Sequence, residues 1–140
     1  MPVINPRKIP RYKAPRPSER EIGVVLAPEI GNYDKATVAV VQLPPEGNTG
    51  LHKHEGSDEI IYVSSGEGEF IEVINEKELV SEIRPGYLMV AKSGTIHMVK
   101  NTGSTHLELF CVFIPPIAQP TPALAEAINR AREYFSQLKQ

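Results

Sequence analysis

Between residues 21 and 114 the sequence alternates short apolar segments with turn-forming residues, and this alternation restricts the fold more than any other feature. The segments are rich in Val, Ile, Phe and Tyr, which favour strands; they span 21–27, 36–43, 59–65, 68–75, 77–83, 87–92, 97–101 and 106–114. Stretches such as SGEG and NTGS separate them. Because no helical pattern intervenes, the sequence predicts an all-β sandwich or barrel.

The first twenty residues differ from this region in composition. Residues 1–20 hold prolines at positions 2, 6, 10, 15 and 17, together with six basic residues and the single acidic residue Glu19. Prolines at this density favour an extended arm over a helix. We expect the arm to lie along the body or to cross to a partner subunit. Contact with nucleic acid is the weaker alternative, because Tyr12 is the only aromatic residue among the basic ones and no partner-binding fold lies beside the arm.

The segment after residue 115 has the pattern of a short linker followed by a helix. Thr121 can cap the helix and Pro122 suits its first turn. One apolar stripe then recurs at spacings of three and four residues, formed by Leu124, Ile128, Ala131, Phe135 and Leu138. We therefore predict an arm over 1–20, a barrel over 21–115, and a linker with a C-terminal helix over 116–140, the helical pattern beginning at Thr121.

Length, charge and cysteine content set further limits. A chain of 140 residues corresponds to one domain, and a net charge of −2 creates no general attraction for nucleic acid or membranes. The single cysteine, Cys111, excludes a disulfide within the chain and fits a reducing compartment. No apolar segment has the length of a signal peptide core or a membrane-spanning helix. We expect a cytoplasmic protein with neither nucleic acid nor membrane partners.

Three of the four histidines and one glutamate have the pattern of a metal site. His52 and His54 are two residues apart, so in an extended chain both imidazoles project from the same face. Glu59 follows after the tight loop EGSD, and His97 begins a later strand just after Gly94. Imidazole suits Fe, Ni, Cu and Zn, and a carboxylate extends the range to Mn. With no cysteine nearby, the donor set favours an open site over a closed structural zinc site.

These two stretches resemble the paired motifs of the cupin superfamily, over about residues 36 to 114. The matching positions are Gly47, His52, His54, Glu59 and Gly66, followed by Gly86, Lys92, Gly94, His97 and Asn101. Two positions depart from the usual pattern: Gly47 is one residue closer to His52 than is common, and Lys92 stands where proline is usual. Both are turn positions, so they bear on loop shape more than on the ligands.

The resemblance implies a double-stranded β-helix, or jelly-roll, barrel of the RmlC-like kind with a short C-terminal α-helix. It also implies one divalent metal ion (Fe, Mn, Ni, Co or Zn) held by His52, His54, Glu59 and His97. Cupins commonly form homodimers, often by extending a sheet with an N-terminal strand, and we expect a homodimer here.

The function implied is that of a metalloenzyme acting on a small oxygenated molecule, of the dioxygenase, decarboxylase, isomerase or cyclase type. The catalytic residues are not assigned, because a fold and its metal do not determine the reaction. The alternative is a non-catalytic module that binds a sugar or another metabolite. A storage or scaffold role is the third hypothesis, and the intact ligand set argues against it.

Several side chains near the motifs have uncertain roles. Ile61 and Val63 share the face of Glu59, so we expect them to line an apolar pocket wall. Glu108 and Cys111 lie on opposite faces of the last strand, and the sequence does not decide which one faces inward. His106 is either an acid or base near the cavity or an exposed histidine at the strand edge.

Overall fold

Every apolar segment of the β region forms a strand in the computed structural model, which describes residues 3–138. The strands are β2 (Arg20–Leu26), β3 (Thr37–Leu43), β4 (Asp58–Ser65), β5 (Gly68–Ile74), β6 (Lys77–Ile83), β7 (Leu88–Ala91), β8 (Ile96–Asn101) and β9 (Leu107–Ile114). Their ends agree with the predicted segments to within one residue. The all-β prediction is therefore confirmed for this region.

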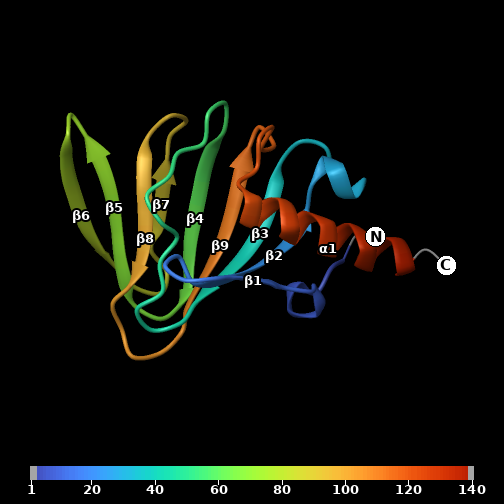
Figure 1. Cartoon of the computed structure of the whole chain (residues 1–140), viewed down its shortest axis with the longest axis horizontal. Coiled ribbons are helices and arrows are strands. Elements are labelled where there is room, and N and C mark those ends of the chain that lie inside the picture. Colours follow the sequence, from blue (N-terminus) through green and yellow to red (C-terminus); the bar gives the residue numbers. More distant parts are fainter. Residues whose placement is uncertain (1–2, 139–140) are drawn as a thin grey trace.

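The strands assemble into two antiparallel sheets that enclose one core (Figure 1). The larger sheet has six strands in the order β1-β2-β3-β9-β4-β7, and the smaller has three in the order β6-β5-β8. Strands that follow one another in the chain are often not neighbours in a sheet. For example, β9 lies between β3 and β4. This arrangement confirms the double-stranded β-helix expected from the sequence.

The proline-rich beginning of the chain contributes a strand of its own. A short 3-10 turn, η1 (Pro6–Lys8), is capped by the Asn5 side chain, and β1 (Tyr12–Ala14) follows it. β1 pairs antiparallel with β2 of the same chain, in the register that sets Tyr12 opposite Ile22. This segment therefore lies along the body as the edge of the six-stranded sheet, which is one of the two arrangements expected for it.

The C-terminal helix, α1 (Pro122–Leu138), begins where the sequence predicts. The Leu124 backbone N–H donates to Thr121 Oγ1 at 3.3 Å, which is the expected cap. Leu124, Ile128, Ala131 and Phe135 are buried, whereas Leu138 is exposed. The last two residues of the predicted helix lie outside the described residues.

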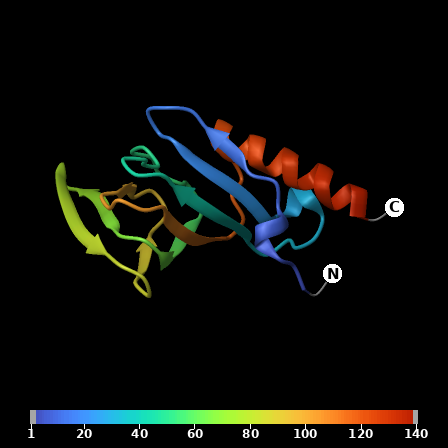
Figure 2. The same ribbon diagram turned by 90° about the horizontal axis from the view of Figure 1, so that it is seen from below.

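The helix and the smaller sheet together cover the inner face of the larger sheet. α1 contacts β1, β2 and η2 (Pro28–Ile30), while β5 and β8 lie at the other end, as the two views show (Figures 1 and 2). Side chains from β2, β3, β8, β9 and α1 line the same cavity. Within residues 3–138, no helix is both long and apolar enough to cross a membrane.

Candidate metal centre

The two motif histidines lie on an extended loop, which pairs with β8 at single points. His52 and His97 exchange backbone hydrogen bonds, with N···O distances of 3.0 and 2.8 Å. The turns at Gly50 and Gly56 have positive φ values of 73° and 84°, which interrupt any longer strand. The chain at His52 is nevertheless extended, and the imidazoles of His52 and His54 project together, with ring centroids 4.8 Å apart.

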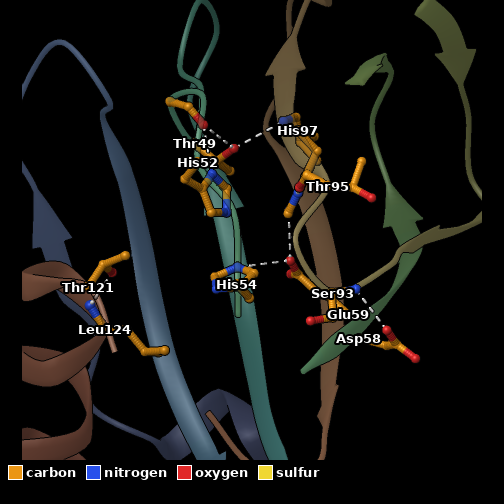
Figure 3. Close-up of polar contacts among 12 residues, drawn as sticks. Thr49, His52, His54, Asp58, Glu59, Ser93, Thr95, His97, Thr121 and Leu124 are labelled. Atoms are coloured by element: carbon orange, nitrogen blue, oxygen red, sulfur yellow. Dashed lines mark hydrogen bonds and ion pairs between the residues drawn. The ribbon is translucent and has the colours of Figure 1, made fainter. Parts of the chain in front are cut away.

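The structure brings all four candidate ligands together (Figure 3). Glu59 extends from the start of β4 and His97 from β8, and both are buried. One potential ligand atom from each of His52, His54, Glu59 and His97 lies within 4.8 Å of the others. His52 and His97 are 45 positions apart in the chain, yet they belong to one compact cluster.

The hydrogen bonds of two histidines fix which ring nitrogen faces the cluster. His52 Nδ1 lies 2.7 Å from the Gly50 carbonyl oxygen, and His97 Nδ1 lies 2.9 Å from the Thr95 carbonyl oxygen. A carbonyl oxygen only accepts, so both Nδ1 atoms carry a proton. In the neutral imidazole the Nε2 atom then has the free lone pair. A hydrogen bond from the other ring nitrogen to a backbone carbonyl is typical of metal-binding histidines.

Two imidazole nitrogens converge on the Glu59 carboxylate. Glu59 Oε1 lies 3.0 Å from His97 Nε2 and 3.4 Å from His54 Nε2. His54 Nε2 is buried and has no hydrogen-bond partner within residues 3–138. Three imidazole nitrogens and a carboxylate oxygen suit a divalent ion, and such an ion would satisfy the unpartnered nitrogen. The residues present therefore fit the metal that the sequence implies.

The pKa values of the cluster follow from burial and close contact. Burial alone would raise the pKa of Glu59, but the close contacts with the His54 and His97 imidazoles outweigh it and lower the pKa to about 2. Burial lowers the pKa of His52 to about 4. Burial acts in the same direction on His97, but its bonds to Glu59 and the Thr95 carbonyl prevail, so its pKa is raised. The metal-free cluster therefore holds its positive charge on His97.

Two polar contacts fix the loops that carry these ligands. The Ser93 backbone N–H donates to Asp58 Oδ1 at 2.8 Å, and the Gly56 N–H donates to Ser93 Oγ at 2.8 Å. At the other end of β8, Asn101 Nδ2 donates to the Leu43 carbonyl oxygen at 2.9 Å. The motif asparagine thereby ties β8 to the end of β3, and the cluster lies on a rigid frame.

The cluster opens on a small cavity of about 60 Å³ between the sheets and α1. Its wall is mostly apolar, formed by Ile22, Ala39, Val41, Val99, Leu109, Phe113 and Leu124. The Phe113 ring meets the His54 ring edge to face, with centroids 5.0 Å apart. Arg20 and Cys111 also line the cavity, and burial together with the nearby Glu59 raises the pKa of the Cys111 thiol. An apolar cavity with a few convergent polar groups is typical of a small-molecule site.

The structure decides the roles that the sequence left open. On β9, Cys111 faces inward, whereas Glu108 faces outward and accepts a hydrogen bond from Gln42 Nε2 at 2.8 Å. His106 is exposed and does not line the cavity, which leaves only the alternative of an edge histidine. Lys92 is exposed in a turn, and its carbonyl accepts from the Thr95 N–H.

One expectation about the cavity wall is wrong. Ile61 and Val63 share the inner face with Glu59 as predicted, but they are buried in the core and do not line the cavity. The wall instead includes Arg20 and Leu124, which come from segments outside both motifs. β9 pairs with β4 in the same sheet, and it is Leu109, Cys111 and Phe113 of β9 that line the cavity.

The comparisons with known proteins agree with this architecture. A family model described as a cupin domain matches residues 39–113. The chain is 36% identical to an oxalate-binding protein of Thermotoga maritima over 111 residues, which are 79% of this chain and 88% of that protein. A crystal structure of a predicted oxalate decarboxylase from Thermotoga maritima is 34% identical, with a TM-score of 0.69, and the match covers 81% of this chain and 98% of that one.

A third similarity concerns the fold alone. The crystal structure of a protein with a double-stranded β-helix domain from Klebsiella pneumoniae is 23% identical and has a TM-score of 0.65. The match covers 82% of this chain and 90% of that chain. The two proteins therefore share the barrel architecture, although few of their residues are identical.

Proposed function

Because this chain belongs to the cupin family, we propose that its cluster holds a divalent metal ion and that the protein is a metalloenzyme acting on a small carboxylate. His52, His54, Glu59 and His97 would supply the protein ligands. The ligand class is suggested by the relative named oxalate-binding protein, and a reaction of the decarboxylase type by the similar structure described as a predicted oxalate decarboxylase.

The observation that carries this proposal is the unsatisfied geometry of the cluster. His54 Nε2 is buried without a hydrogen-bond partner and lies 3.4 Å from a buried carboxylate oxygen. A buried polar atom without a partner has a free-energy cost of about 1–3 kcal/mol, which a bound ion would remove. When bound, the ion would supply Lewis-acid and, for iron or manganese, redox chemistry.

The size and polarity of the cavity restrict the ligand. The space beside the cluster is only about 60 Å³, which favours a compact ligand such as oxalate over a bulkier one such as a sugar acid. The apolar side chains around the cluster would exclude bulk water and strengthen the attraction for an anion.

The second candidate function is binding without turnover, and one observation favours it. Apart from the four candidate ligands, the described cavity wall contains only Arg20 and Cys111 as ionisable groups. An arginine remains protonated, and the raised pKa of Cys111 makes its thiol a poor acid. A decarboxylase must deliver a proton to carbon, and no side chain of this wall is suited to that step.

One experiment tests the proposal and separates the two functions. Protein loaded with Mn²⁺ would be titrated with oxalate by calorimetry, and then incubated with oxalate while formate and CO₂ are measured. We expect binding in the loaded protein and none after the metal is removed. Product formation would support the enzyme, and binding without product would support the alternative. If the loaded protein binds no oxalate, the proposed ligand class is wrong.

A further inference from the structure

We propose that Arg20 is the second anchor of the ligand, and that it makes the cavity selective for compact dicarboxylates over monocarboxylates. This inference rests on the proposed function and names the ligand class of the same site. It concerns a residue outside both histidine motifs, on a strand that precedes them in the chain.

The position of Arg20 on β2 directs its side chain into the cavity. Arg20 and Ile22 are two residues apart on the strand, so they share a face, and both line the cavity with the metal cluster. Burial lowers the pKa of Arg20, and the negative charge of Glu59 partly opposes this shift. The guanidinium therefore lies within the electrostatic reach of the cluster.

The guanidinium keeps most of its donors free. Within residues 3–138, Arg20 takes part in no ion pair, and its Nη1 donates one hydrogen bond, at 2.8 Å, to the Ser18 carbonyl oxygen. An arginine side chain has five N–H donors in a planar arrangement that matches a carboxylate. A half-buried arginine with unpaired donors facing an apolar cavity is suited to bind an anion there.

The backbone around Arg20 is held against the loop that carries the histidines. Asn48 Nδ2 donates to the Pro17 carbonyl oxygen at 3.0 Å. A Cβ atom on Gly47 would lie 2.7 Å from the Glu19 carbonyl oxygen, and one on Gly50 would lie 2.8 Å from Ser18 Oγ. Only glycine permits this close approach at Gly47, so the segment before β2 and the ligand loop form one packed unit. Arg20 is thereby pre-organised relative to His52.

The charges in the cavity favour a dianion. A divalent ion with Glu59 leaves one net positive charge, and Arg20 adds a second, because the histidine ligands are neutral when they bind a metal. A dicarboxylate with two negative charges neutralises the site, whereas a monocarboxylate leaves one positive charge in an apolar wall. Leaving that charge unpaired in a cavity of low polarity is costly. The charge difference and the small volume together select a short dicarboxylate such as oxalate.

The test compares oxalate with oxamate, which has the same number of non-hydrogen atoms but carries an amide in place of one carboxylate. Both ligands would be titrated by calorimetry into Mn²⁺-loaded wild-type protein and into Arg20→Met, Arg20→Lys and Arg84→Met. Arg84 is an exposed arginine outside the cavity and serves as the matched control for loss of one positive charge. Metal content and the thermal unfolding midpoint would be measured for each variant.

We expect Arg20→Met to weaken oxalate binding about 10- to 100-fold, the loss typical of a charged hydrogen-bonding partner. The same variant should weaken oxamate binding less than about threefold, so that the preference for oxalate falls at least about threefold. Arg20→Lys should lie between wild type and Arg20→Met, because it keeps the charge without the planar donors. Arg84→Met should match wild type, and all variants should keep the metal.

Three results would contradict the inference, and they are distinguishable. If Arg20→Met keeps its metal and binds oxalate within threefold of wild type, Arg20 is not an anchor, and the proposed function stands. If wild-type protein with full metal content binds no oxalate, the proposed function fails and the dianion selectivity fails with it. If Arg20→Met does not fold, Arg20→Lys decides alone: affinity and selectivity equal to wild type would contradict the role of the planar donors.

Discussion

Glu59 is almost fully buried at the start of β4, where its carboxylate contacts two imidazoles. A buried carboxylate is costly unless a positive charge lies beside it. In the metal-free protein that charge is a proton on His97, whose pKa is raised by the bond to Glu59. A divalent ion would take the place of this proton. The cluster therefore couples metal binding to the protonation of one histidine.

This coupling predicts that metal binding releases a proton. At pH 6.5 the raised pKa of His97 keeps much of it protonated, whereas His52, with a pKa of about 4, is neutral and Glu59, with a pKa of about 2, is ionised. Neither of the last two contributes a proton at this pH. We expect Mn²⁺ binding at pH 6.5 to release more than about half a proton from His97, and the affinity to fall as the pH falls through the raised pKa.

Calorimetry in two buffers of different ionisation enthalpy measures the number of protons released. The same titrations at pH 5.5 and pH 7.5 give the change in affinity, which should approach tenfold for each pH unit below the pKa of His97. Zero proton release at pH 6.5, or equal affinity at the two pH values, would contradict the protonation state described for the metal-free cluster.

The four clustered positions could be predicted from the sequence because each of the two motifs is local and the pair resembles that of the cupin superfamily. His52 and His54 share a face in any extended chain, and the motif around His97 has its own glycine turn. Arg20 could not be predicted, because its orientation depends on the register of β2 and on the approach of residues 15–19 to the ligand loop. The orientation of Cys111 likewise became clear only once the register of β9 was known.

Turn glycines determine how the strands come together. Gly66 ends β4 with a φ of 87°, and a Cβ atom there would collide with the backbone of His106 and Leu107. Gly86 has a similar φ of 92°, but no atom outside its own neighbourhood lies within 4 Å of the same position. The two glycines thus share a backbone conformation and differ in their surroundings, which allows the two effects to be separated.

We expect Gly66→Ala to destabilise the protein more than Gly86→Ala. The Gly86 variant should lose about 1 kcal/mol in the free energy of unfolding, because alanine is strained at positive φ. The Gly66 variant should lose a further 1–3 kcal/mol, roughly, because the backbone it meets cannot move aside easily. Urea unfolding of both variants measures the difference. Equal losses would show that close packing at Gly66 is unimportant.

The sequence predicts α1 and all the strands except β1, and the difference has a physical reason. The β segments and α1 have apolar patterns with clear turn or capping residues, and their ends match the prediction closely. β1 was not among the predicted strands, because its three residues lie in a proline-rich segment without alternation. It forms because pairing with β2 and burial of Ala14 compensate for weak local preference.

The outer face of the six-stranded sheet is unusually apolar for an exposed surface. Tyr62, Leu88, Val90 and Phe110 project from it and are between 39% and 62% exposed. Tyr62 is paired with Phe110 on one side and with Leu88 on the other, so these side chains are neighbours. We call these four residues the outer apolar face. Contiguous patches of this kind are typical of protein–protein interfaces.

The homodimer expected from the sequence stays a prediction, and the outer apolar face is the surface on which we expect a second copy to lie. Leu88→Glu should place a charge in that interface and yield a monomer, as measured by light scattering after size-exclusion chromatography. Leu79→Glu is the matched control, since Leu79 is similarly exposed on β6 of the other sheet. A Leu88→Glu protein with the mass of wild type would show that the dimer forms elsewhere or not at all.

The central claim is that His52, His54, Glu59 and His97 hold one metal ion, and elemental mass spectrometry tests it most directly. Wild-type protein and His52→Ala would be purified without a histidine tag or chelator and measured before and after loading with Mn²⁺. The account predicts about one equivalent of divalent metal in wild type and loss of stoichiometric metal in a variant that keeps its fold by circular dichroism. Absence of metal from wild type after loading, or equal metal content in His52→Ala, would contradict it.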